Sequence, residues 1–471
     1  MSSSTRTKSQ STAGTAAVDT SPARTELPPS AESSVTVPAA TGAHSCGEYR
    51  VGPARAGDHL AIHRLLIHLF QQPSSSEFQA QLEDPRYEPS DRILVRRGDQ
   101  LVGHTLLLPR EVRFGSINLP CGYIHDLGIL PEYRSRGFAT QLLAAAEQQL
   151  HADGALFGLL RTAVPGFFLK RGWLLGPRPA FSMAGAREIL ARLIEAPKPP
   201  VRFLEPDPIP LNIRIWRHVE QAALIRLYNQ YASGRYGPAI RTDADWRWLL
   251  GRRAFDQVYV AIQGPDKLEL DDTFAAIVGY AITRKSRILE LITAPDCPAA
   301  ATQLLARVCG DAIEQDLTYV RLDAPADDRL HAFFATAGGN PQVQPQGTGD
   351  CLMVKVFEPL TMLARLAPLF TQRVATARRT LPCELGLQCG SAKYSLNLQT
   401  TGLEIQVGRL GRSYLELQPN DLTALLFGQI ELESALASGR IVASTRIAAE
   451  TASMLFPAFN FHRQPWDLLT A

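Results

Sequence analysis

The stretch from residue 127 to residue 140 contains residue types that could bind an anion. It joins an apolar, strand-like run to an amphipathic, helix-like run. Gly137 and Ala139 are small where the chain turns, so backbone amides can approach an anion closely. The first amides of a helix are unpaired and partly positive, and Arg134 and Arg136 add full charges. The pattern predicts a cradle for a diphosphate, the alternative being an ordinary strand–helix turn with solvated arginines.

The runs around this segment predict an α/β domain over residues 48–196. Apolar alternation predicts strands, and apolar residues spaced by three and four predict helices. The diphosphate cradle then lies between a strand and the helix that follows it. The expected strands cover residues 49–51, 93–97, 101–114, 123–130, 155–160 and 173–183, and the expected helices begin at Asp58 and cover 138–151 and 165–171.

The rest of the chain divides into four parts. The first 45 residues contain no aromatic residue and no isoleucine, which predicts a disordered tail over 1–47. Six prolines between 197 and 210 predict a linker. Residues 211–350 repeat the strand and helix order of the first domain. Residues 351–471 begin differently, with a long helix at 359–377, four strands and three helices, which indicates an α+β domain.

Composition excludes several classes of protein. A net charge of +2 argues against a polybasic protein that binds nucleic acid or a membrane surface. The seven cysteines contain no CxxC pair, which argues against a disulfide scaffold or a zinc ribbon and favours a reducing cytoplasm. His59 and His63 are four residues apart on one expected helix. Without an acidic or cysteine ligand nearby, they are expected on a solvated face, and no metal site is predicted.

Two motifs carry a resemblance to a known family. Residues 134–139, Arg-Ser-Arg-Gly-Phe-Ala, fit the Arg/Gln-x-x-Gly-x-Gly/Ala signature of the GCN5-related N-acetyltransferases (GNAT). Residues 167–173 resemble the family's Tyr-x-x-x-Gly-Phe signature. The resemblance implies that the turn holds the diphosphate of acetyl-CoA and that the preceding strand lies along the pantetheine arm. The residues expected to bind acetyl-CoA are Leu127, Gly128, Ile129, Arg134, Ser135, Arg136, Gly137, Phe138, Ala139, Thr140, Thr162 and Phe168.

The whole chain resembles the enhanced intracellular survival (Eis) family. That resemblance also rests on residues 420–428, 439–441, 455–457 and 465–466. It implies tandem GNAT-like mixed-sheet domains followed by a sterol-carrier-protein-like α+β domain. It also implies acetylation of amines, among them aminoglycosides and lysine side chains, and a hexamer. The second domain lacks the Arg-x-x-Gly pattern and carries Asp296 where phosphates would bind, so we expect it to bind no CoA.

The candidate catalytic groups come from the resemblance and from the strand that precedes the cradle. By resemblance, the C-terminal carboxylate of Ala471 would act as the base. Asp126 and His125 are local candidates, and strand alternation turns only one of them toward the cleft. The family's usual acid is a tyrosine four residues before the glycine of the second motif. Here Phe168 occupies that position, and a phenyl ring donates no proton.

The sequence therefore predicts a cytoplasmic acetyl-CoA-dependent N-acetyltransferase that acts on a primary amine of a polyamine, an aminoglycoside-like compound or a protein lysine. It leaves two alternatives open, a CoA-binding sensor or scaffold with little turnover and a lipid-binding protein that depends on the third domain. Glu77, Glu83 and Asp84 are the acids suggested to line an acceptor pocket, and a solvated helix face is the alternative for them.

Overall fold

The computed structural model describes residues 49–177, 180–195, 210–264, 277–343 and 351–468. The chain divides into two units, Met1–Gly42 and Ala43–Ala471, and every described residue belongs to the second. The predicted tail and nearly all of the predicted linker lie outside the described residues. Within the described part of the chain, no helix combines the length and apolar character needed to cross a membrane.

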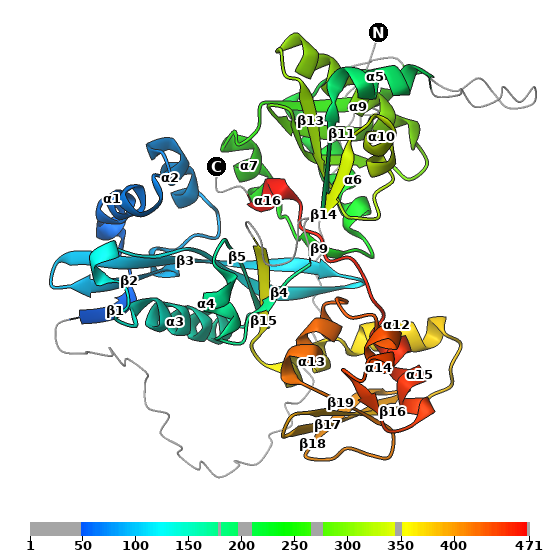
Figure 1. The fold of residues 1–471 in the computed structure, drawn as a ribbon. Coiled ribbons are helices and arrows are strands. Elements are labelled where there is room, and N and C mark those ends of the chain that lie inside the picture. The colour runs from blue at the N-terminus through cyan, green and yellow to red at the C-terminus, as the bar shows by residue number, and fades with distance from the viewer. Residues whose placement is uncertain (1–48, 178–179, 196–209, 265–276, 344–350, 469–471) are drawn as a thin grey trace, which may run out of the picture. The chain divides into compact units, whose positions relative to one another are not determined.

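The first sheet has eight strands and surrounds the segment singled out in the sequence. Its order is β1-β2-β3-β4-β5-β15-β6, and β9 pairs with β3. Figure 1 shows α1 and α3 on opposite faces of this sheet. The strands are β1 (Tyr49–Pro53), β2 (Arg92–Arg97), β3 (Gln100–Phe114), β4 (Ile117–Ile129), β5 (Phe157–Thr162), β6 (Leu174–Leu175), β9 (Tyr236–Ala239) and β15 (Cys351–Val356), and the helices are α1 (His59–Phe70), α2 (Ser75–Leu82), α3 (Phe138–Ala152) and α4 (Pro165–Leu169).

The second sheet has seven strands in the order β14-β7-β13-β12-β11-β10-β8. Its buried residues form one apolar cluster with those of the helices beside it. Its strands are β7 (Ala180–Gly185), β8 (Leu211–Ile215), β10 (Gln257–Gln263), β11 (Ile277–Arg284), β12 (Arg287–Thr293), β13 (Tyr319–Asp323) and β14 (Asn340–Val343), and its helices are α5 (Ala186–Glu195), α6 (Gln221–Ala232), α7 (Asp243–Gly251), α9 (Ala299–Glu314) and α10 (Leu330–Thr336).

The third sheet has five strands in the order β18-β17-β16-β19-β20. The predicted helix at 359–377 is two helices, because α12 starts with a proline in its first turn, where the missing amide ends the preceding helix. The strands are β16 (Cys383–Cys389), β17 (Ala392–Gln399), β18 (Gly402–Val407), β19 (Tyr414–Leu417) and β20 (Val442–Ala443), and the helices are α11 (Pro359–Arg365), α12 (Ala367–Thr376), α13 (Pro419–Leu426), α14 (Leu432–Ala437) and α15 (Arg446–Leu455). The last helix, α16 (Pro465–Leu468), returns to the second sheet, where Trp466 is part of the buried cluster. The mixed α/β architecture agrees with the prediction, while the sterol-carrier likeness of the third predicted domain stays a prediction.

Strand pairing crosses the predicted domain boundaries. β7 belongs to the predicted first domain by sequence, yet it pairs with β13 and β14 of the second sheet. β15 begins the predicted third domain, yet it pairs with β5 and β6 of the first sheet. The boundaries at 196 and 350 therefore do not follow sheet membership. Apolar alternation identifies a strand but not its partner. The sequences of β7 and β15 therefore contain no signal that each strand pairs in the sheet of a different predicted domain.

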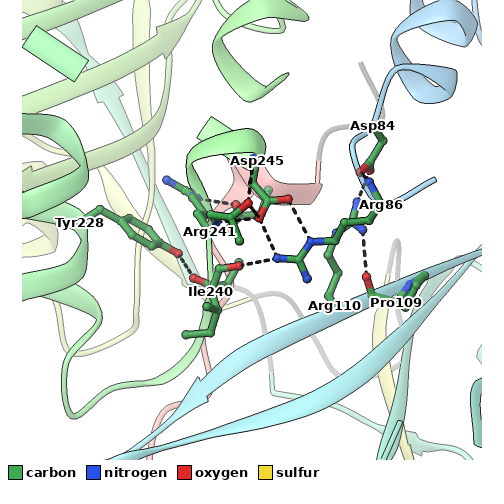
Figure 2. A network of polar contacts seen from close by, with 11 residues as sticks. Asp84, Arg86, Pro109, Arg110, Tyr228, Ile240, Arg241 and Asp245 are labelled. Carbon is green, nitrogen blue, oxygen red and sulfur yellow. Dashed lines mark hydrogen bonds and ion pairs between the residues drawn. The ribbon is translucent and has the colours of Figure 1, made fainter. Parts of the chain in front are cut away.

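Buried ion pairs join segments that are far apart in the sequence. Arg86, just after α2, binds the carboxylate of Asp245 in α7 with an Nη2–Oδ2 distance of 2.7 Å, and it also donates to the carbonyl of Ile240 (Figure 2). Arg241 is 1% exposed at its side chain and pairs with Glu290 at 2.6 Å and with Asp467 at 2.8 Å. This cation ties β12 to α16.

We expect Arg241→Met to lower the free energy of unfolding by about 3–5 kcal/mol, because it leaves the buried carboxylate of Glu290 without its counter-ion. Thermal and denaturant unfolding followed by circular dichroism would measure the change. The control is Arg192→Met, which removes a cation from an exposed pair with Glu195. Equal stability of the two variants would contradict a structural role for the Arg241 pair.

Candidate active site

An irregularity in β4 shapes the site. On one side β4 pairs antiparallel with β3, and the register shifts between His104↔Gly128 and Leu106↔His125, so β4 contains one extra residue. Asp126 lies in this bulge and has a left-handed backbone, with a φ of 52°. On the other side β4 runs parallel to β5, and their pairing ends at Ile124↔Leu160. A bulge at this point bends the strand and ends its pairing, as bulges near binding sites commonly do.

A cavity of about 760 Å³ lies where β4 and β5 stop pairing, and the start of α3 completes its wall. We call it the β4–α3 cavity. Its size is typical of a cofactor site. All of the residues expected to bind acetyl-CoA line it except Arg136. The structure thus brings together eleven of the twelve predicted positions, which come from β4, the turn, α3, β5 and α4.

The turn before α3 has the backbone of an anion-binding loop. Ser135 and Gly137 are both left-handed, with φ values of 62° and 85°. Gly137 is the N-cap residue of α3, and a Cβ atom added there would meet no protein atom within 4 Å. The turn is therefore open on the side of Gly137, at the point where α3 begins. A concave run of amides at a helix N-terminus favours negative charge.

Three arginines have different roles around this turn. Arg134 lines the cavity, and its Nε donates to the carbonyl of Ile129 at 3.1 Å. Arg136 does not line it, because its guanidinium donates to the Tyr49 hydroxyl at 3.2 Å and to a backbone carbonyl. Sequence reasoning missed Arg171, which lines the cavity and donates to the Thr140 hydroxyl at 2.6 Å. Arg171 could have been identified from its position directly before Gly172 in the second motif.

Phe168 contributes an apolar wall. It is 6% exposed, lines the β4–α3 cavity, and packs edge-on against Phe167 and Trp173 with ring centroids 4.9 and 6.3 Å away. Tyr133 lines the same cavity, and its hydroxyl donates to the side chain of Gln100 at 3.1 Å. The position of the usual acid is therefore filled by a packed ring without a donor.

The two local candidates for the base face different cavities. Asp126 lines the β4–α3 cavity, whereas His125 lines a second one. Burial raises the pKa of Asp126, and the charge of Arg92 offsets part of the rise. Burial and nearby arginines, with Arg110 the largest of these, lower the pKa of His125 to about 4. The His125 imidazole is therefore neutral near neutral pH. Ala471 lies outside the described residues.

The second cavity, of about 530 Å³, lies among α2, α7 and the β3–β4 pair. We call it the α2–α7 cavity. Its two helical walls are joined, since the Trp248 indole donates to the carbonyl of Ala80 at 2.8 Å. Glu77, Glu83 and Asp84, the acids named from the sequence, do line it. Asp84 pairs with Arg110, as Figure 2 shows.

His59 and His63 are partly buried rather than solvated. His59 shares a hydrogen bond with the Tyr87 hydroxyl at 2.8 Å, and His63 is bonded to the carbonyl of Pro73 at 2.9 Å and stacks on Phe78. Both rings have protein partners. Among the residues that the structure describes, no group of three or more histidine, cysteine or acidic side chains has the arrangement to hold a metal ion.

Comparisons with known proteins agree with this geometry. Residues 50–176 match the family model described as an acetyltransferase (GNAT) domain. An aminoglycoside 2'-N-acetyltransferase of Mycolicibacterium fortuitum is 31% identical over 88 residues, which are 18% of this chain. The chain spans about half of that relative, with 45% of its length matched.

Solved structures share the fold over most of the chain. A GCN5-related N-acetyltransferase from Anabaena variabilis matches with a TM-score of 0.63 at 18% identity, covering 88% of this chain and 100% of that one. Eis1 from Mycobacterium abscessus matches with a TM-score of 0.56 at 14% identity, covering 88% of this chain and 98% of that one. At sequence identities this low, the two matches show that the fold is shared and nothing beyond the fold. Residues 50–176 of this chain are a domain of the GNAT acetyltransferase family.

Proposed function

We propose that the protein is an acetyl-CoA-dependent N-acetyltransferase that transfers an acetyl group to a primary amine. The observation that carries the proposal is the β4–α3 cavity, which is lined by the open turn at Gly137, by the start of α3, and by Arg134 and Arg171. Amides and guanidinium groups suit a diphosphate, and the slot between β4 and β5 suits an extended pantetheine arm. The residues present therefore fit acetyl-CoA.

The residues around the bulge suggest how transfer would proceed. Acetyl-CoA supplies an acetyl thioester, from which the amine takes the acetyl carbon as the carbon–sulfur bond breaks and a thiolate leaves. Leu127 lies in the bulge of β4, beyond the last residue that pairs with β5, and a backbone amide of this segment would polarise the thioester carbonyl. His125 faces the second cavity with a neutral ring that can accept a hydrogen bond from the incoming amine, although the burial that lowers its pKa to about 4 makes it a weak base.

The α2–α7 cavity is the proposed site of the acceptor. His125 and Asp126 are consecutive, yet they line different cavities, so the two cavities meet across one strand of backbone. An amine in one cavity could then reach a thioester in the other. The sequence relative acts, by its name, on an aminoglycoside, and a polyamine or a lysine side chain has the same reacting group.

One observation favours a second function. Phe168 leaves the cavity without the usual acid, which suits a CoA-binding sensor or scaffold with little turnover. A thiolate is a tolerable leaving group, however, since a thiol has a solution pKa of about 8.5. We therefore prefer an enzyme that works without this acid.

A base role for the Ala471 carboxylate, a homo-hexamer and a cytoplasmic location remain proposals that rest on family resemblance and composition.

The cradle can be tested with a pair of nearly isosteric variants. Asp and Asn both tolerate the left-handed backbone of Gly137 and differ in charge. We expect Gly137→Asp to weaken acetyl-CoA binding at least about tenfold more than Gly137→Asn, because its carboxylate repels the diphosphate. Isothermal titration calorimetry would measure both. Equal affinities of the two variants for acetyl-CoA would show that the diphosphate does not bind at this turn.

The two arginines of the motif should differ in effect. We expect Arg134→Met to weaken acetyl-CoA binding about 10- to 100-fold, the range for a hydrogen bond to a charged group. Arg136→Met is the matched control, and we expect little change because Arg136 is directed to Tyr49 and away from the cavity. A larger loss in Arg136→Met than in Arg134→Met would contradict the placement of the diphosphate.

Restoring the hydroxyl at Phe168 separates the two functions. We expect Phe168→Tyr to raise the turnover number about 10- to 100-fold on an accepted amine, because a proton donor then faces the leaving thiolate. The control is Phe167→Tyr, which adds a hydroxyl to the neighbouring ring of the same cavity. If turnover is unchanged while acetyl-CoA affinity is retained, the enzyme does not need an acid at this position.

A further inference from the structure

The α2–α7 cavity contains a buried cation that lacks a counter-ion among the described residues. Arg463, just before α16, is 7% exposed and lines the cavity. Its guanidinium carbon lies 4.6 Å from the centre of the Tyr123 ring. Its Nε and Nη1 atoms are buried and have no hydrogen-bond partner, and neither does the Tyr123 hydroxyl. Asp467 is close enough to favour this charge without pairing with it, but buried N–H groups that lack an acceptor are unfavourable, so this place favours a bound anion.

The acids of the same cavity are already engaged. Asp84 makes an ion pair with Arg110, and Asp467 binds Arg241 through Oδ1 at 2.8 Å, while its buried Oδ2 has no hydrogen-bond partner. Glu77 and Glu83 accept hydrogen bonds at 2.7 and 3.0 Å from residues of α2 and its N-cap. Both acids of the cavity whose side chains are buried, Asp84 and Asp467, therefore already have an arginine partner.

The charge of the lining points the same way. Five arginines line the α2–α7 cavity against four acidic residues. Arg253 is exposed and Arg284 is partly exposed, so they lie nearer the solvent than Arg463 does. A ligand that enters here meets guanidinium groups at the rim and again in the interior. Guanidinium groups bind carboxylates with charge-assisted hydrogen bonds.

Resting on the proposed function, we infer that the acceptor is an amine that also carries a carboxylate, and that Arg463 binds this carboxylate. The reacting amine then lies toward His125, which is on the same strand as Tyr123 and lines the same cavity. Tyr123 and His125 are two residues apart, so their side chains lie on one face of β4, and their rings stack 5.8 Å apart. Free amino acids and related amino carboxylates have the required pair of groups.

Matched substrates test the inference on the full-length protein. L-lysine and 1,5-diaminopentane differ only by the carboxylate, as do L-ornithine and 1,4-diaminobutane, and L-tyrosine and tyramine. We expect kcat/KM for acetyl-CoA-dependent acetylation to be at least about tenfold higher for the carboxylated member of each pair that reacts, the value of one charge-assisted hydrogen bond. Higher kcat/KM for the decarboxylated members would overturn the inference, as would turnover confined to amines that lack a carboxylate.

Variants then assign the effect to Arg463. We expect Arg463→Gln to lower kcat/KM for the carboxylated amine about tenfold, mainly through KM, and to leave its decarboxylated partner unaffected, with partial rescue by Arg463→Lys. Arg253→Gln, at the exposed rim of the same cavity, is the control. If Arg463→Gln does not fold, the matched substrates still decide. A wild-type protein that binds no acetyl-CoA, or acetylates no amine, would instead overturn the proposed function.

Discussion

The left-handed backbone at Asp126 is the constraint on which both cavities depend, and a buried histidine holds it. His104 is fully buried, its Nε2 lies 3.1 Å from Nη1 of Arg92, and its Nδ1 lies 3.1 Å from the carbonyl oxygen of Asp126. A guanidinium can only donate, so Nε2 accepts and Nδ1 donates to the Asp126 carbonyl. Burial lowers the pKa of His104 to about 3, which keeps the ring neutral. The carbonyl is therefore fixed, and β4 turns consecutive side chains into different cavities.

The opposite wall of the β4–α3 cavity is held from a distant part of the chain. β5 leaves β4 after Leu160 but stays paired with β15 along its whole length, from Cys351↔Thr162 to Val356↔Phe157. β15 thus holds the end of β5 from its other edge, where the pairing with β4 has already ended. Lys355 of β15 also binds Glu147 of α3 at 2.7 Å, and Glu147 accepts from the Trp173 indole at 2.7 Å. The position of β15 in the first sheet therefore supports the site as well as joining the first and third predicted domains.

What the sequence could predict was local. The turn at 134–140 is recognisable because its glycine, arginines and helix start are contiguous, and most of the predicted residues do line one cavity. Arg136 belongs to the same motif, but its direction is set by Tyr49, which is 87 residues away. Arg463 and Arg92 had no local signal, since an arginine reads as a surface residue until tertiary packing buries it. The strands that pair with β7 and β15 could not be predicted from the sequence either.

The two cavities differ in how much of their lining falls within the residues that match the family model. Every residue that lines the β4–α3 cavity falls within 50–176, so the GNAT match covers the whole of this wall. The α2–α7 cavity takes Trp248, the 251–254 segment, Arg284, Arg463 and Asp467 from outside that range. If the α2–α7 cavity binds the acceptor, as proposed, proteins that share the first domain can still differ in their acceptor, because much of the lining of this cavity comes from residues after 176. The charge of that wall, rather than the name of a relative, is the physical guide to the acceptor.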